Sequence, residues 1–92
     1  MDYKSIISAC DSNTHLVSML PVERVIEFGF NIGLDANTTV LDLCCGYGEM
    51  LRLWNEAFSI SGIGVDIEDS FIAKGSKRIL SDRVNLLTGD VF

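Results

Sequence analysis

Residues Thr38 to Leu51, TTVLDLCCGYGEML, join an apolar run that contains Asp42 to a turn with two cysteines and two glycines. Two interpretations of this turn compete. The cysteines indicate a metal or redox site, whereas the glycines indicate a bend that brings the backbone close to a ligand. The rest of the sequence has to decide between these two kinds of site.

The three cysteines of the chain, Cys10, Cys44 and Cys45, do not favour a metal or redox site. An odd number of cysteines without a secretory signal argues against a disulfide framework. Neighbouring residues on an extended segment point to opposite faces, which would strain a bridge between Cys44 and Cys45. A zinc site needs further ligands at short spacing, and His15 is the only histidine. The sequence therefore predicts no metal site.

Composition limits the chain to one small domain. It has 92 residues, 48% of them hydrophobic, and a formal net charge of −6 from 13 acidic and 7 basic side chains. This balance argues against a nucleic-acid partner, because binding to phosphates requires a basic surface. No apolar run reaches the roughly 18 residues of a membrane-spanning helix, and the first residues do not resemble a signal peptide. We expect a cytoplasmic protein without a membrane partner.

Helical and extended patterns alternate along the chain. Residues 1–20 suggest a helical extension, and Pro21 opens an amphipathic helix that continues to about Ile32. Helices of about ten residues separate the three expected strands. These strands are Val40–Cys44, Ile63–Ile67 and Val84–Leu87. Such alternation predicts an α/β fold with a parallel sheet and flanking helices, and the mostly apolar first strand predicts burial on both of its faces.

Ligands of parallel sheets bind beyond the carboxyl ends of the strands. Three groups fall at those ends in this chain: the turn Gly46-Tyr47-Gly48, Asp66 and Asp90. Glycines let a ligand approach the backbone. Asp66 follows Gly46 by 20 residues, the offset at which an acid on the next strand binds the two hydroxyls of a ribose. The pattern therefore predicts a nucleoside site at this edge of the sheet.

Each of these residues also has a purely structural interpretation. The glycines can form an ordinary turn, Asp66 can be a solvated strand end, and Asp90 can be a turn residue. Asp42 can be a buried acid that accepts hydrogen bonds from loop amides. The combination favours a ligand site, because three separate strand ends supply suitable groups at one edge.

Three segments, in order, resemble motifs of class I S-adenosylmethionine-dependent methyltransferases. VLDLCCGYGEML is similar to the first motif of that family, GIGVDI to its acid-ended second strand, and VNLLTGDVF to its third strand. The likeness covers Val22 to Phe92 and departs at Cys44, where the family usually has glycine. It implies the first three strands of a Rossmann-like sheet in the order 3-2-1, and hence a partial methyltransferase domain.

The resemblance assigns parts of S-adenosylmethionine to residues of this chain. Asp42 would lie against the methionine portion, Asp66 would bind the ribose hydroxyls, and Ile67 would contact the adenine. Asp90 would approach the adenine amino group, with Val91 beside the ring. The full set of expected cofactor-binding residues is Asp42, Cys44, Cys45, Gly46, Tyr47, Gly48, Asp66, Ile67, Asp90 and Val91.

The resemblance also implies the chemistry, which is methyl transfer to an acceptor that the sequence does not identify. No catalytic residue is assigned, since His15 is expected to be structural or exposed. The family's later strands carry most acceptor contacts, so we expect this chain to be the cofactor half and to be inactive alone. The first strand would lack its usual neighbour, which predicts self-association through the Val40–Leu43 edge or the apolar helix faces.

Two other functions stay open at this point. One is a different nucleotide-binding enzyme, such as an NAD-dependent dehydrogenase, although its G-x-G-x-x-G pattern would need glycine at Leu51. The other is a non-enzymatic half-domain that acts by association.

Overall fold

The computed structural model describes residues 21–90. The expected extension at residues 1–20 and the expected adenine contact Val91 lie outside this range. The described elements, in chain order, are α3 (Val22–Asn31), β1 (Thr39–Leu43), α4 (Glu49–Phe58), β2 (Ser61–Asp66), α5 (Asp69–Arg78) and β3 (Val84–Thr88). None of the helices within residues 21–90 is long and apolar enough to cross a membrane.

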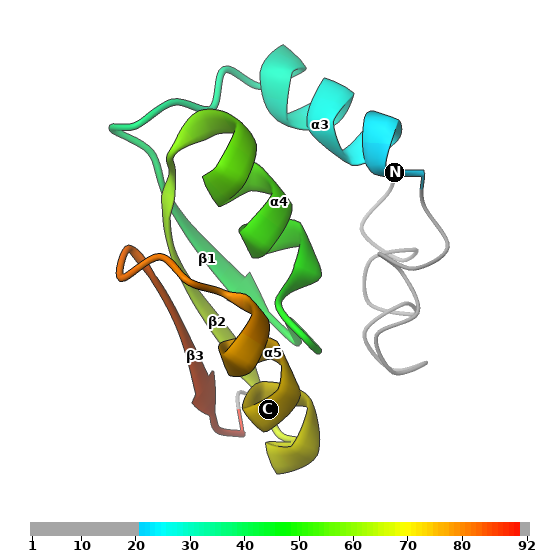
Figure 1. Ribbon diagram of the computed structural model, residues 1–92, viewed down its shortest axis with the longest axis vertical. Helices are drawn as coiled ribbons and strands as arrows, with labels where there is room; N and C mark the ends of the chain where they lie inside the picture. Colours follow the sequence, from blue (N-terminus) through cyan, green and yellow to red (C-terminus); the bar gives the residue numbers. More distant parts are fainter. Residues whose placement is uncertain (1–20, 91–92) are drawn as a thin grey trace.

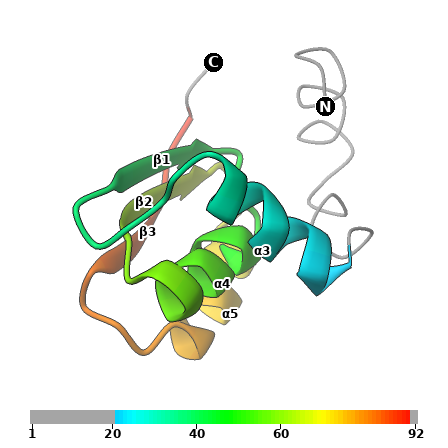
Figure 2. The same ribbon diagram turned by 90° about the horizontal axis from the view of Figure 1, so that it is seen from above.

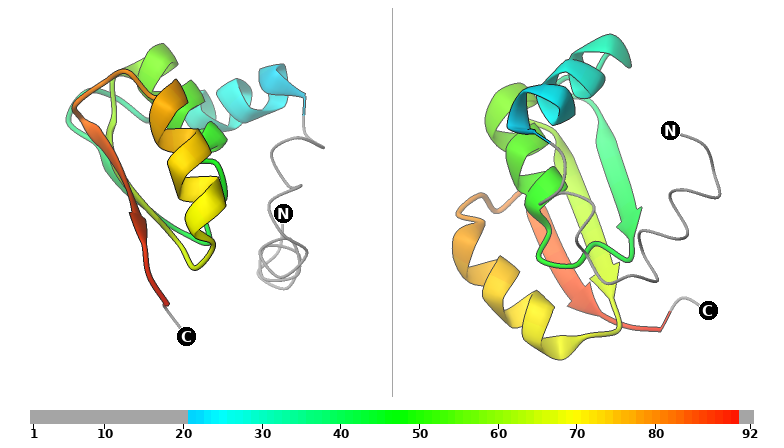
Figure 3. Two further views of the ribbon diagram at one scale, coloured as in Figure 1. Left: turned by 60° about the horizontal axis from the view of Figure 1, so that its bottom comes forward. Right: turned by 90° about the vertical axis from the view of Figure 1, so that its right-hand side faces the viewer.

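Parallel pairing joins the three strands into one sheet with the order β1-β2-β3. In this register, Asp42 lies beside Gly64 and Asp66 lies beside Thr88. Figure 3 shows that the three strands run in the same direction, so their carboxyl ends share one edge. The predicted fold class and strand order are confirmed, and the strand ends differ from the expected bounds by at most two residues.

All three described helices lie on the same face of the sheet (Figures 1 and 2). The core forms where they meet the sheet, and α4 contributes most of it. Leu51 of α4 and Ile60, which precedes β2, are fully buried. The buried cluster comprises Val25, Leu51, Leu53, Trp54, Ile60 and Val84.

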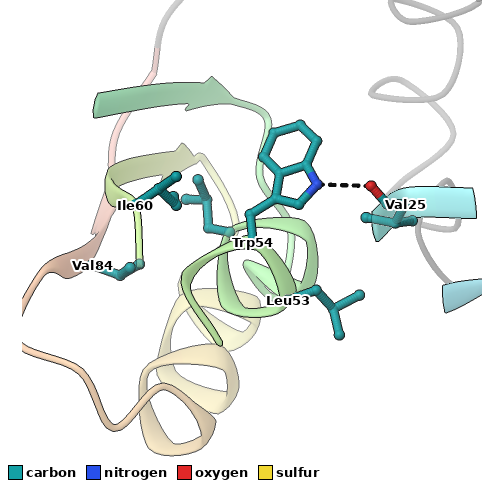
Figure 4. Close-up of a cluster of buried hydrophobic side chains, with 6 residues drawn as sticks. Val25, Leu53, Trp54, Ile60 and Val84 are labelled. Carbon is teal, nitrogen blue, oxygen red and sulfur yellow. Dashed lines mark hydrogen bonds between the residues drawn. The ribbon is translucent and has the colours of Figure 1, made fainter. Parts of the chain in front are cut away.

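A tryptophan fixes α3 against α4. The indole nitrogen of Trp54 donates a hydrogen bond of 2.9 Å to the carbonyl oxygen of Val25 (Figure 4). Phe28 stacks on the same indole, with a centroid distance of 6.2 Å. A Cβ atom at Gly29 would come within 2.7 Å of the indole nitrogen, so the helices approach closely because this residue has no side chain.

The opposite face of the sheet carries apolar side chains that no described element covers. Leu41 and Leu43 of β1 are 63% and 46% exposed, and Ile63 and Leu87 on the neighbouring strands are 40% and 53% exposed. The prediction that the first strand is buried on both faces is therefore wrong for residues 21–90. The apolar pattern is compatible with burial on both faces. All the described helices, however, cover the face opposite to Leu41 and Leu43.

Candidate functional site

The β1–α4 turn has an unusual backbone. Cys44, Gly46 and Gly48 have φ values of 64°, 59° and 71°, in the left-handed region. Glycine adopts this region freely, whereas a residue with a Cβ atom is disfavoured there by roughly 1–2 kcal/mol. Cys44 is the position at which the sequence departs from the family motif, and the structure places it in a conformation that suits glycine.

Asp66 connects the end of β2 to this turn. The backbone N–H of Gly46 donates a hydrogen bond of 2.9 Å to Asp66 Oδ2, and the N–H of Glu68 donates one of 2.9 Å to Oδ1. The residue is only 9% exposed. The interpretation of Asp66 as a solvated strand end is therefore wrong, because it is a buried acid held by two backbone amides.

The third strand end lies beside the second. The N–H of Gly89 donates a hydrogen bond of 3.0 Å to the carbonyl oxygen of Asp66, and Asp90 follows directly in an exposed position. On the other flank, the N–H of Cys45 donates one of 2.9 Å to the carbonyl oxygen of Val65. The expected proximity of the three strand ends is confirmed, while the ligand contacts assigned to them remain predictions.

The turn also packs against α5. Tyr47 and Phe71 have a ring-centroid distance of 4.7 Å. A Cβ atom at Gly75 would collide with the backbone carbonyl of Tyr47, which shows how closely α5 approaches the turn. A Cβ atom at Gly48 would lie 2.8 Å from Leu86. The direction that a Cβ atom would take at Gly48 is therefore filled by Leu86, so this glycine is needed for packing against the core.

Two acids, Asp42 and Asp66, interact electrostatically near the turn, and no cation of residues 21–90 contributes to the pKa of Asp42. Burial raises the pKa of Asp42 to about 6, and the negative charge of Asp66 contributes to this rise. Burial, reinforced by both carboxylates, also raises the pKa of the Cys45 thiol to about 12. The thiol is therefore protonated at neutral pH, which argues against a role as a nucleophile or a metal ligand.

The two arginines near the start of α4 pair with glutamates and not with Asp42 or Asp66. Arg52 donates hydrogen bonds to Glu49 and to Glu56, and Arg78 of α5 pairs with Glu49 at 3.1 Å. The hydrogen bond from Arg52 lowers the pKa of Glu49. This network ties α4 to α5 and occupies the two guanidinium groups.

Sequence reasoning missed the part played by Gly64. A Cβ atom there would lie 2.8 Å from Cys45 Sγ. Because Gly64 has no side chain, Cys45 of the turn can pack directly against β2. The signal was present in the segment Gly62-Ile63-Gly64, where glycines alternate on one face of a strand. The amide of Glu68, which holds Asp66, had no comparable sequence signal.

Comparison with known proteins finds similarity over nearly the whole chain. No protein-family model matches the sequence. The uncharacterized protein YjhP of Escherichia coli K12 is 29% identical over 94 aligned positions, which cover 98% of this chain and 38% of that protein.

Two solved structures of S-adenosylmethionine-dependent methyltransferases, both in complex with S-adenosyl-L-homocysteine, are also similar. The one from Geobacter sulfurreducens has 31% identity and a TM-score of 0.75, and the match covers 94% of this chain and 36% of that protein. The one from Thiobacillus denitrificans has 29% identity and a TM-score of 0.75, with 98% and 38% covered. This chain thus spans less than two fifths of the length of these relatives, and the resemblance expected from its motifs is confirmed.

Proposed function

Because this chain is similar in sequence and fold to class I S-adenosylmethionine-dependent methyltransferases, we propose that it is the cofactor-binding part of such an enzyme. The placement of Asp66 carries this proposal. Its buried carboxylate lies where the first two strand ends meet, and each oxygen accepts one backbone hydrogen bond. A carboxylate oxygen has two lone pairs, so each retains the capacity to accept a hydroxyl. Two adjacent ribose hydroxyls match this arrangement.

Charge favours S-adenosylmethionine over a dinucleotide. Asp66 is close enough to Asp42 for its charge to raise the pKa of Asp42. A sulfonium and an ammonium group are attracted to such a pair, whereas a pyrophosphate is repelled. The alternative of an NAD-dependent enzyme is therefore not favoured.

We propose the same cofactor contacts as the motifs imply, with Asp42 near the methionine portion and Asp66 at the ribose. Backbone groups of the turn would contribute at the methionine end, where Gly46 and Gly48 have no side chains to keep the cofactor away. The other proposed contacts are Cys44, Cys45, Gly46, Tyr47 and Gly48 near the methionine portion, and Ile67, Asp90 and Val91 near the adenine.

Bound S-adenosylmethionine supplies a methyl group already activated by its sulfonium. The residues of this chain would bind, orient and shield it, which lowers the entropic part of the barrier to transfer. We propose binding of the acceptor and methyl transfer only for a protein as long as these relatives. We expect this chain alone to bind the cofactor without catalysing methyl transfer. The free cysteines Cys44 and Cys45 are consistent with a reducing compartment, so we propose a cytoplasmic location.

Isothermal titration calorimetry at pH 7.5 tests the proposed cofactor site. S-adenosylmethionine and S-adenosylhomocysteine should bind, and NAD should not. Asp66→Asn should weaken binding by more than roughly tenfold, since hydrogen bonds to a charged group contribute about 1.5–3 kcal/mol. Asp82→Asn is the matched control, because this exposed acid precedes β3 at the opposite edge of the sheet. Absence of binding by a folded sample, or equal effects of the two variants, would contradict the proposal.

We also propose that the chain associates with a second copy of itself. Among residues 21–90, β1 has a strand partner on one side only. Its exposed side chains Leu41 and Leu43 form part of the uncovered apolar face of the sheet. An unpaired strand edge of this kind pairs readily with another chain. The alternative contact is the apolar surface of α3, where Val22, Phe28 and Phe30 are more than half exposed.

A further inference from the structure

Asp42 occupies a position that an acid rarely takes. It alternates with Val40 on the face of β1 that the helices cover, and Val40 packs against the core. Its neighbour in register on β2 is Gly64, against which the Cys45 thiol lies. Asp66 projects on the same face one strand away, because it alternates with Gly62 and Gly64. The sheet therefore brings two carboxylates together on one partly buried face.

Among residues 21–90, the titratable groups on the surrounding elements do not balance this negative charge. β2 contributes Asp66, and the turn contributes the Cys45 thiol, which stays neutral at physiological pH. The first turn of α4 contributes Glu49, which holds Arg52 and, from α5, Arg78. None of these cations is among the causes that set the pKa of Asp42; the causes are burial and Asp66.

We infer that Asp42 is the proton-linked residue of the cofactor site, which loses a proton when the cationic methionine portion of the cofactor binds. This inference rests on the proposed function, because it concerns the same site. A cation beside the carboxylate favours its ionised form, and by linkage the ionised form favours the cation. Cofactor affinity should therefore rise with pH across the range in which Asp42 titrates.

The expected size follows from the two protonation equilibria. The pKa of Asp42 in the free chain is about 6. A neighbouring cation that returns it to about 4, the ordinary value for an aspartate, makes binding about tenfold weaker at pH 5 than at pH 7. At pH 6 about half of the free molecules carry this proton, so binding should release about half a proton per site.

Calorimetry in two buffers measures the proton release directly. S-adenosylmethionine is titrated into the chain at pH 6 in buffers that differ in ionisation enthalpy, and the difference in observed heat gives the number of protons released. Affinity is then measured at pH 5 and at pH 7, with circular dichroism to establish that the chain stays folded. These measurements need no variant, so they remain decisive even if a substitution at position 42 prevents folding.

Asp42→Asn identifies the group. It should abolish the proton release and flatten the pH dependence to less than twofold, while Asp82→Asn should leave both unchanged. Binding without proton release in the unsubstituted chain, or release that persists in Asp42→Asn, would overturn the inference while the proposed function stands. Absence of cofactor binding at every pH would overturn the proposed function itself.

Discussion

Replacement of Asp42 by asparagine should stabilise the folded chain at neutral pH, although it removes a residue of the proposed site. The physical reason is the environment of the carboxylate. Burial and the nearby charge of Asp66 raise its pKa from 3.8 to about 6, so the folded state resists the ionisation that the unfolded chain accepts. An amide of the same shape avoids this conflict because it never ionises.

The sign and size of the effect follow from linkage. Below pH 3.8 the carboxyl group of Asp42 is protonated in both states and has no effect on the free energy of unfolding. Between pH 3.8 and about 6 the unfolded state loses its proton first, so stability falls as pH rises. Above pH 6 the loss is constant at about 3 kcal/mol, since one pKa unit corresponds to about 1.4 kcal/mol.

Urea denaturation at pH 7.5 and at pH 5 measures the difference. Both values lie above the isoelectric point of about 4.4, where the chain keeps a net negative charge. Asp42→Asn should raise the free energy of unfolding by about 2–3 kcal/mol at pH 7.5, and by about half as much at pH 5. Asp82→Asn, which removes the same charge from an exposed position, should change it by less than about 0.5 kcal/mol at both.

Two results would refute this reasoning. A loss of stability in Asp42→Asn at pH 7.5 would mean that the carboxylate is well stabilised by its surroundings. An equal gain at both pH values would mean that the gain comes from packing and not from the protonation equilibrium.

Two further predictions concern the turn and the uncovered sheet face. Cys44→Gly should leave stability unchanged or raise it by up to about 1 kcal/mol, because glycine fits the φ of 64°; Cys45→Gly should lower it, because this buried residue packs against Gly64. Equal losses in urea denaturation would contradict the first prediction. The double variant Leu41→Gln, Leu43→Gln should shift the chain toward a monomer in sedimentation velocity, and an unsubstituted chain that is monomeric at high concentration would contradict self-association.

Local patterns in the sequence were sufficient to predict that the glycine turn and Asp66 lie together at one edge of the sheet. The glycines of the turn and the acid 20 residues later are chemical signals that do not depend on the rest of the molecule. Parallel strands then bring Gly46 and Asp66 to one edge, where the 2.9 Å hydrogen bond joins them. Alternation of strands and helices was equally sufficient for the fold, because each crossover has one favoured hand.

Contacts between distant segments could not be predicted in this way. The sequence does not reveal that Gly48 makes room for Leu86, because this depends on how β3 lies beneath the turn. Nor does it reveal that Leu41 and Leu43 are exposed, because burial of a strand face depends on which side the helices cover. The apolar composition of β1 shows that this strand is suited to burial on both faces. Its second face is exposed because no element within residues 21–90 covers it.

Two departures from good local folding rules occur at the carboxyl edge of the sheet, while a third, Ser59 with a φ of 62°, ends α4 at the opposite edge. Asp42 raises the free energy of the folded state, and Cys44 adopts a conformation that suits glycine. Asp66, by contrast, is buried, and each of its carboxylate oxygens accepts a backbone hydrogen bond. Backbone strain and buried charge cluster at ligand sites in proteins, so their combination at this edge supports the proposed site. Asp42 lowers the stability of the fold, whereas Asp66 on the neighbouring strand is fixed by backbone hydrogen bonds. This pair of acids suits a site for a cationic nucleoside.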